Sequence, residues 1–146
     1  TMVRDINNMP EARIALDEAL DDGMEDLYDD TLETLLKNWS RGSDAMGNSW
    51  ESLSPTTIER KGHGAILVDS GDLRDNVKQK SEYRTKDKTF VLTSSLPYAG
   101  AHEFGLPEQG IPARPFLGPA AQYAVGQIED QVGEKIDDYL EGVEVR

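Results

Sequence analysis

NMPEARIALDEALDDGMEDLYDDTLETLLKN, residues 8–38, carries apolar side chains at helical spacing along most of its length. At roughly 100° per residue these positions fall within about 100° of arc, which predicts one long amphipathic helix. They are Leu16, Leu20, Met24, Leu27 and Leu35. Asn8 followed by Glu11 resembles a capping box, and Pro10 suits the first turn because its missing amide would lack a helical partner there.

The opposite face of this helix is strongly acidic, and we interpret it as a solvated surface. Its carboxylates are Glu18, Asp22, Glu25, Asp26, Asp29, Asp30 and Glu33. The 146-residue chain has a formal net charge of −13, and its two ends carry the excess. Residues 1–37 hold 11 acidic and 3 basic residues, residues 38–118 hold 10 of each, and residues 119–146 hold 7 acidic and 2 basic.

Seven like-charged pairs four residues apart oppose this helix at low salt. They are Asp17/Asp21, Glu18/Asp22, Asp21/Glu25, Asp22/Asp26, Glu25/Asp29, Asp26/Asp30 and Asp29/Glu33. At ~0.2 to 0.5 kcal/mol each, they cost roughly 1.5 to 3.5 kcal/mol, against the ~5 to 15 kcal/mol that stabilise a typical domain. Because molar salt shortens the Debye length to ~3 Å, we hypothesise a halophilic setting rather than a cationic partner.

The rest of the chain predicts shorter elements. Residues 40–76 are predicted to be mostly irregular, except for a short helix at SPTTIERK (54–61) that Ser54 caps. We expect Trp50 and Leu53 to pack this stretch on the core. Alternating residues over 77–93 predict a β-hairpin that turns at Lys86 and Asp87.

Residues 119–141 predict a C-terminal helix with Pro119 in its first turn. Its apolar stripe is expected to contain Ala121, Val125, Ile128, Val132, Ile136 and Tyr139, with its carboxylates facing away. We therefore predict one α+β domain over residues 1–146, in which a small antiparallel sheet packs against long N-terminal and C-terminal amphipathic helices.

The composition argues against several kinds of chemistry. The chain has no cysteine and only two histidines, and HEFG (102–105) lacks the second histidine of a zinc-binding HExxH motif. His102 beside Glu103 suggests a general base only weakly, because adjacent side chains point apart. No glycine pattern matches a phosphate-binding loop. We expect no enzyme activity, no metal and no cofactor.

No apolar run reaches the ~20 residues needed to cross a bilayer, and the first residues lack the apolar centre of a secretory signal. We expect a soluble protein made in the cytoplasm, with no membrane partner. One group of basic residues departs from the acidic balance: Lys78, Lys80, Arg84, Lys86 and Lys88. On a strand face they could contact DNA phosphates or an acidic partner, or they could simply prevent edge-to-edge pairing of an exposed strand.

Five blocks in series carry a resemblance: WESL (50–53), TTIERK (56–61), LVDSGDL (67–73), YAGAHEFG (98–105) and IPARPFLG (111–118). Together they resemble the phage virion morphogenesis family, which contains the tail-completion proteins of Mu-like and P2-like tailed phages. The most specific part is HEFG followed shortly by IPARPFLG. Glu103 stands where the family commonly has glutamine, and Ser70 where it commonly has threonine. The acidity suggests the tailed virus of a haloarchaeon.

The resemblance implies a structural protein of the head–tail neck rather than an enzyme. Such a protein assembles in the host cytoplasm, joins the virion as a cyclic ring, for which we expect six copies, and completes the tail. It would bind portal, adaptor or head-completion proteins on one side and tail tube or terminator proteins on the other, with transient contact to packaged DNA. The residues expected at subunit interfaces or in the structural motif are Trp50, Leu53, Gly71, Leu73, Tyr98, His102, Phe104, Gly105, Pro112, Arg114, Pro115, Phe116 and Leu117.

IPARPFLG reads as a stiff lead into the last helix, because its two prolines fix φ near −65° and bias the preceding residues toward extended conformations. Phe116 and Leu117 would anchor it in the core or on a neighbouring subunit. Arg114 would pair with a carboxylate, either of the next copy or within the same chain.

Two other functions stay open on the sequence alone. An acidic DNA mimic would present carboxylates in place of phosphates to a host nucleic-acid-binding protein. A hydrolase that uses His102 is the weaker possibility.

Overall fold

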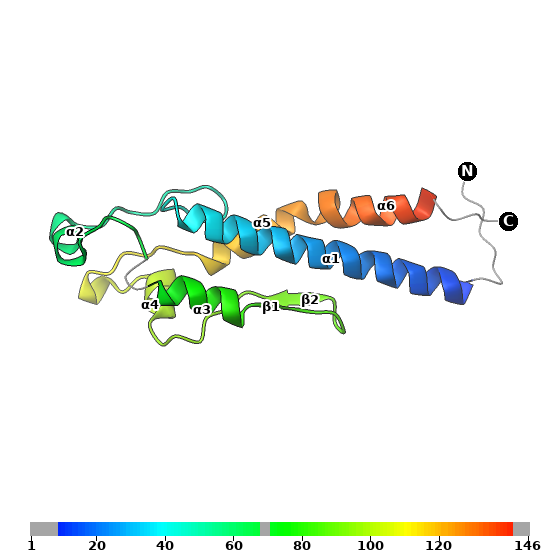
Figure 1. Cartoon of the computed structure of the whole chain (residues 1–146), viewed down its shortest axis with the longest axis horizontal. Coiled ribbons are helices and arrows are strands. Elements are labelled where there is room, and N and C mark those ends of the chain that lie inside the picture. Colours follow the sequence, from blue (N-terminus) through cyan, green and yellow to red (C-terminus); the bar gives the residue numbers. More distant parts are fainter. Residues whose placement is uncertain (1–8, 68–70, 142–146) are drawn as a thin grey trace.

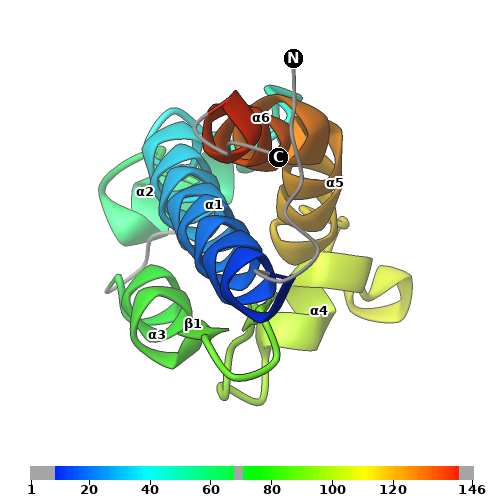
Figure 2. The same ribbon diagram turned by 90° about the vertical axis from the view of Figure 1, so that its right-hand side faces the viewer.

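The structure, a computed structural model, describes residues 9–67 and 71–141. Its central element is α1 (Met9–Trp39), a single 31-residue helix that confirms the long helix expected from the sequence. The expected cap, Asn8, lies outside the described residues. The molecule is elongated along α1, with the C-terminal helices on one side of it and the hairpin on another (Figures 1 and 2). The α+β class is therefore confirmed.

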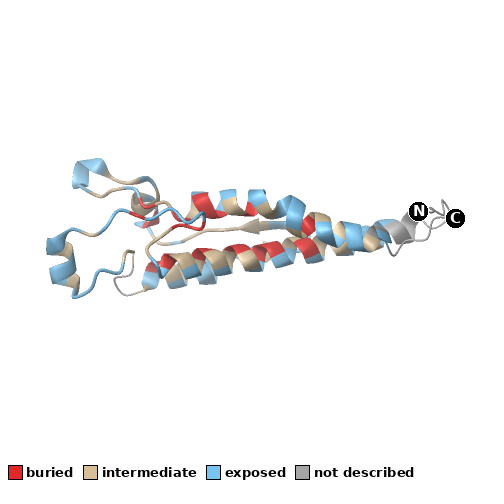
Figure 3. Ribbon diagram, turned by 90° about the horizontal axis from the view of Figure 1, so that it is seen from above, coloured by how far each residue is buried: buried red, intermediate tan, exposed pale blue. Residues whose placement is uncertain are grey.

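The buried face of α1 differs in part from the expected stripe. Leu27 and Leu35 are fully buried, whereas Leu16 is exposed. The core gathers around the C-terminal half of α1 (Figure 3). It consists of Leu35, Trp39, Ala45, Trp50, Leu73, Val77, Ala99, Phe116 and Ala120. Three of these side chains are aromatic, Trp39, Trp50 and Phe116, and burial of such large apolar rings stabilises the fold.

The C-terminal helical region runs antiparallel to α1 and contains α5 (Leu117–Gln127), a π-helical turn η3 (Ile128–Val132) and α6 (Gly133–Glu141). The expected helix over 119–141 is present, but half of its predicted stripe is wrong. Ala121, Val125 and Ile128 are exposed, while Ala120 and Ala124 are buried in their place.

The π turn explains this difference. The N–H of Gly133 donates to the carbonyl of Ile128, so this turn takes up one residue more than an α-helical turn. The apolar face therefore shifts its phase, and Ala124 shares the buried side with Val132 and not with Val125. Gly23 of α1 faces the turn, where a Cβ would lie 3.1 Å from the Cα of Val132. The backbones approach closely here because Gly23 has no side chain.

The sequence prediction over residues 77–93 is half wrong. Residues 77–80 belong to a helix, α3 (Asp72–Lys80), and only the second part forms the hairpin of β1 (Glu82–Arg84) and β2 (Thr89–Val91). The strands pair antiparallel with Tyr83 opposite Phe90, and the chain turns through residues 85–88 as expected. Val77 and Ser81 are both buried four residues apart, a spacing that fits a helix as well as a strand.

The hairpin packs on α1 through aromatic rings and anchors some of the acidic side chains. Tyr28 stacks between Tyr83 and Phe90, with ring centroids 6.4 and 5.7 Å away. The Tyr83 hydroxyl donates to the Asp21 carboxylate, and burial together with this bond raises the pKa of Tyr83. Lys88 Nζ lies 2.8 Å from Asp17 Oδ1.

The C-terminal helices engage two further carboxylates of α1. Asp30 accepts hydrogen bonds from the Tyr123 hydroxyl and from Gln131 Nε2, both at 2.7 Å, and Lys135 lies 3.4 Å from Asp26. The hydrogen bond to Asp30 raises the pKa of Tyr123. Glu18, Asp22, Glu25, Asp26, Asp29 and Glu33 are exposed, as the interpretation of a solvated face requires. For Asp30 that interpretation is wrong, because its carboxylate is half-buried against the C-terminal helical region.

This surface predicts a salt dependence of stability. The melting temperature should rise between low salt and molar NaCl, because screening removes repulsion between the exposed carboxylates. A variant with Asp22→Asn and Asp29→Asn, which removes four of the seven like-charged pairs, should show a smaller rise in thermal melts. A melting temperature that stays constant in salt for the unmodified chain would contradict the halophilic interpretation.

Three short helical elements complete the fold. α2 (Pro55–Lys61) begins as expected, with Ser54 Oγ accepting from the N–H of Thr57 at 3.2 Å. α4 (Ala99–Phe104) and the 3-10 turn η2 (Pro107–Gln109) precede the IPARPFLG segment. These elements bring residues 50–53, 98–105 and 111–118 together at the start of α5.

Candidate functional site

The blocks WESL, YAGAHEFG and IPARPFLG meet in one place, which we call the motif junction (residues 50–53, 98–105 and 111–118). Trp50 Nε1 donates to the carbonyl of Pro115 at 2.9 Å and ties the first block to the third. The Trp50 ring packs edge-on against the Trp39 ring, with centroids 5.6 Å apart. The centroid of the Phe116 ring lies 5.0 Å from that of Trp39. Phe116 is fully buried, so it anchors the junction in the core of its own chain.

Arg114 is the buried cation of the junction, and only 7% of its surface is exposed. Its Nε donates to the carbonyl of Glu51 at 2.8 Å and its Nη2 to the carbonyl of Ser52 at 3.2 Å. Its backbone N–H donates to the carbonyl of His102 at 2.7 Å. Within the described part of its own chain Arg114 pairs with no carboxylate and braces two loops through main-chain oxygens. A pair with a carboxylate of the next copy stays a prediction.

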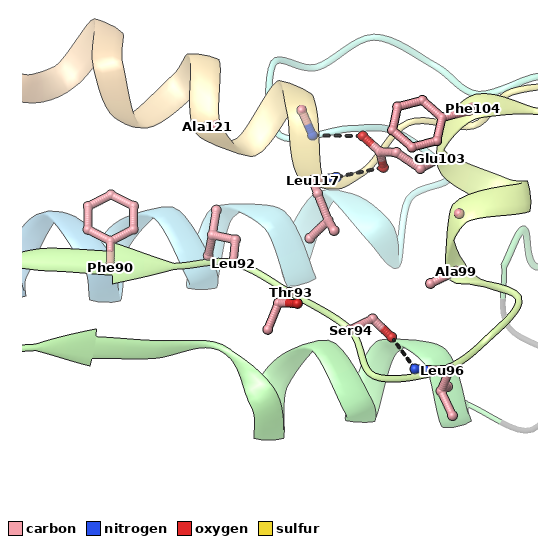
Figure 4. Close-up of a pocket in the computed structure, with 12 residues that line it drawn as sticks. Phe90, Leu92, Thr93, Ser94, Leu96, Ala99, Glu103, Phe104, Leu117 and Ala121 are labelled. Atoms are coloured by element: carbon pink, nitrogen blue, oxygen red, sulfur yellow. Dashed lines mark hydrogen bonds between the residues drawn. The ribbon is translucent and has the colours of Figure 1, made fainter.

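Glu103 has a role that the sequence did not reveal. Its Oε2 accepts hydrogen bonds from the N–H groups of Phe116 and Leu117 at 2.7 and 2.9 Å, and its Oε1 accepts from Gly118 at 2.8 Å. These are free donors at the start of α5, where a negative charge is also favoured by the helix dipole. Glu103 therefore caps α5 from a separate helix, and Figure 4 shows its carboxylate turned toward the start of α5.

Gly105 lets the second and third blocks approach each other. Its φ is +76°, and a Cβ at this position would lie 2.8 Å from the backbone nitrogen of Ala113. Only glycine fits both the conformation and the space. Leu106 and Ile111 then pair as a short antiparallel bridge, which closes the loop between the two blocks.

His102 does not form a catalytic arrangement with its neighbour, because the Glu103 carboxylate faces α5. The imidazole is half-buried and meets the Tyr98 ring edge-on at 6.0 Å. Burial lowers the pKa of His102, and the positive charges of Arg114 and Lys61 lower it further. Its Nδ1 has no hydrogen-bond partner among the described residues, so the neutral imidazole fits this position.

The other expected motif residues fall into two groups. Leu73 is buried in the core, Gly71 starts α3 with a φ of +83°, and Leu53, Pro112, Pro115 and Leu117 are half-buried. Tyr98 and Phe104 are exposed, and Phe104 has 82% of its surface accessible. Phe104 is therefore the apolar motif side chain that is free to meet another molecule.

The basic residues do not form the strand face that the sequence predicted. Lys78 and Lys80 lie on α3, Arg84 lies on β1 with its Nε 2.7 Å from Glu82 Oε1, and Lys88 pairs with Asp17. Lys78, Lys80 and Lys86 are exposed. The single strand face is wrong because residues 77–80 are helical, whereas contact of these five basic residues with DNA stays a prediction.

An apolar groove of about 550 Å³ opens beside the junction, between the end of β2, α4 and the start of α5 (Figure 4). Its apolar lining consists of Phe90, Leu92, Leu96, Ala99, Phe104, Leu117 and Ala121. Phe90 and Leu92 lie in the stretch predicted as a hairpin, and Leu96 follows it, so local patterns did not indicate that these side chains line one groove. Their apolar run was visible, but the surface they share was not.

Two kinds of site are absent from the parts of the chain that the structure describes. No cluster of histidine, aspartate or glutamate there could hold a metal ion. None of the helices between residues 9 and 141, with 68–70 left aside, is long and apolar enough to cross a membrane.

The chain is similar to the uncharacterized protein MJ0331 of Methanocaldococcus jannaschii, with 33% identity over 87 residues. The alignment includes 57% of this chain and 64% of MJ0331, so the chain spans less than two thirds of that relative. No protein-family model matches the chain, and no solved structure matches it. The resemblance to the virion morphogenesis family therefore stays a prediction.

Proposed function

We propose that this chain is a structural protein of the head–tail neck of a tailed virus. It would form a ring, for which we propose six copies, and would complete the tail for attachment to the capsid connector. Its neighbours would be portal, adaptor or head-completion proteins above and tail tube or terminator proteins below. The high-salt setting and contact between the five basic residues named above and packaged DNA belong to the same proposal.

The observation that supports this proposal most is that three of the five blocks resembling the family, residues 50–53, 98–105 and 111–118, meet in one unit. Trp50 contacts the backbone of 111–118, Arg114 contacts the backbone of 50–53, and Glu103 caps the helix that follows. Each of these three blocks therefore satisfies polar groups of another of the three. The unit supplies a rigid frame and leaves Phe104 and a groove on its surface.

Virus particles assembled without this chain test the proposal. We expect separate heads and separate tails in electron micrographs, and joined particles when the chain is supplied again. Normally joined particles in the absence of the chain would overturn the neck function. Tight binding of the free chain to a host nuclease or repressor, with no copies in particles, would instead support the acidic DNA mimic.

A further inference from the structure

The short helix α2 and its flanking turns, residues 54–66, form an arm that packs on the core through Ile66 at its end. None of the seven residues of α2 is buried, and 39% of the surface of Ile58 is exposed. Isolated helices shorter than ~12 residues are marginal in water, so a helix of this length depends on packing. We call residues 54–66 the α2 arm.

The α2 arm and the groove lie on different parts of the molecule. In Figure 1, α2 lies at the extreme end of the molecule opposite the termini, beyond α4 and the start of α5. Residues of β2, α4 and the start of α5 line the groove. In the end view, α2 and α4 lie on different sides of α1 (Figure 2). No residue of the α2 arm lines the groove of its own chain, so the groove is open to the arm of a second copy.

The charges of the two surfaces are complementary. The α2 arm holds Arg60 and Lys61 against one carboxylate, Glu59, in a chain whose net charge is −13. The residues that line the groove include the carboxylate of Glu103 and no basic side chain. Oε1 of Glu103 accepts only one hydrogen bond from α5, so it can accept one more. A cationic helix end therefore meets a favourable potential at the groove, whereas another acidic face of the chain would be repelled.

The shapes also agree. A seven-residue helix is about 10 Å long and presents one apolar side chain, Ile58, between polar neighbours. The groove has room for such a side chain and for the methyl groups around it, and the exposed Phe104 of its lining can close over it. This is the arrangement of a short helix bound in a hydrophobic groove.

We propose that the α2 arm of one copy docks in the groove of the next copy, with Ile58 as its apolar anchor and Arg60 and Lys61 toward Glu103. The inference rests on the proposed ring, since it names the contact between neighbouring subunits. The contact is heterologous, because the arm and the groove are different surfaces, and repeated head-to-tail contacts of this kind close into rings.

Disulfide trapping tests the contact, because the natural chain has no cysteine. The full-length chain with Ile58→Cys and Ala121→Cys should form a ladder of covalent oligomers when it is oxidised in molar salt. Each single cysteine variant should give dimers at most. A matched pair with Ile58→Cys and Glu134→Cys, whose second position is exposed on α6 outside the groove, should give no ladder.

Charge reversal supplies the second readout. The double-cysteine chain, with Ile58→Cys and Ala121→Cys, serves as the background. When Arg60→Glu and Lys61→Glu are added to it, the amount of trapped oligomers should fall at least several-fold. Lys78→Glu with Lys80→Glu makes the same change in net charge on α3 and should leave the ladder as it is. A missing ladder, or an equal ladder from the matched pair, would overturn the arm contact. Detection of the chain in virus particles tests the neck function separately, so the two failures can be told apart.

Discussion

Phe116→Ala should lower the free energy of unfolding by about 3 to 5 kcal/mol, the usual cost of removing a buried phenylalanine side chain. Phe116 is fully buried and lies 5.0 Å from Trp39, which also packs edge-on against Trp50. The substitution would leave a cavity where the junction meets α1. Because 3 to 5 kcal/mol is a large fraction of the stability of a typical domain, the variant should be partly unfolded at elevated temperature.

Phe104→Ala is the matched control for this experiment. It removes the same side chain from a position with 82% of its surface exposed, so the free energy of unfolding should change by no more than about 0.5 kcal/mol. Urea unfolding followed by tryptophan fluorescence reports both variants, because Trp39 and Trp50 are buried beside Phe116. Equal effects of the two substitutions would contradict the packing described for the junction.

Arg114→Ala should lower the free energy of unfolding by about 2 to 3 kcal/mol, the range expected when hydrogen bonds from a charged group are lost. The guanidinium holds the carbonyls of Glu51 and Ser52, and its aliphatic part is buried with it. Its loss should therefore loosen residues 50–53 from the segment 111–118. The destabilisation should be present in the isolated monomer.

Arg84→Ala is the control for Arg114→Ala, because Arg84 is exposed and pairs with Glu82 on the surface. Its effect should stay below about 1 kcal/mol. If Arg114→Ala left the unfolding curve of the monomer unchanged and prevented only assembly, Arg114 would serve an intersubunit contact and the intramolecular role would be wrong.

The parts of the fold that follow from local patterns could be predicted from the sequence. The spacing of apolar residues at about 3.6 positions predicted α1 and its acidic face. Ser54 as a cap, followed by Pro55, predicted the start of α2. The β-branched and aromatic run at residues 89–93 gave the return strand. Each of these signals depends on residues within one or two turns of each other, so no knowledge of the tertiary structure is needed.

The errors arise where one pattern fits two structures or where packing sets the geometry. Val77 and Ser81 lie four positions apart. Four is an even number, as in a strand with alternating faces, and it is also about one turn of a helix, so the two patterns cannot be distinguished there. Gly71 begins α3 without a side-chain cap, which removes the usual start signal. The π turn shifts the buried face after Gln127, and the sequence offers only Gly23, far away on α1, as a hint of that close approach.

The sequence identified the residues of the motif junction as one motif, but it did not predict the contacts between them. The stiffness of IPARPFLG and the burial of Phe116 were readable, but the partners of Arg114 lie more than 60 residues away. The capping role of Glu103 depends on amides 13 to 15 residues later, across a glycine that allows close approach. Contacts of this range depend on the complete fold, which local spacing does not describe.

The most direct test of the whole account is cryo-electron microscopy of the neck of intact particles that carry this chain. The account predicts a closed ring of copies between the capsid connector and the tail tube, with residues 111–118 ordered against α1 within each copy. Particles that contain no copies of the chain, or a ring in which residues 111–118 lie free in solvent, would contradict it.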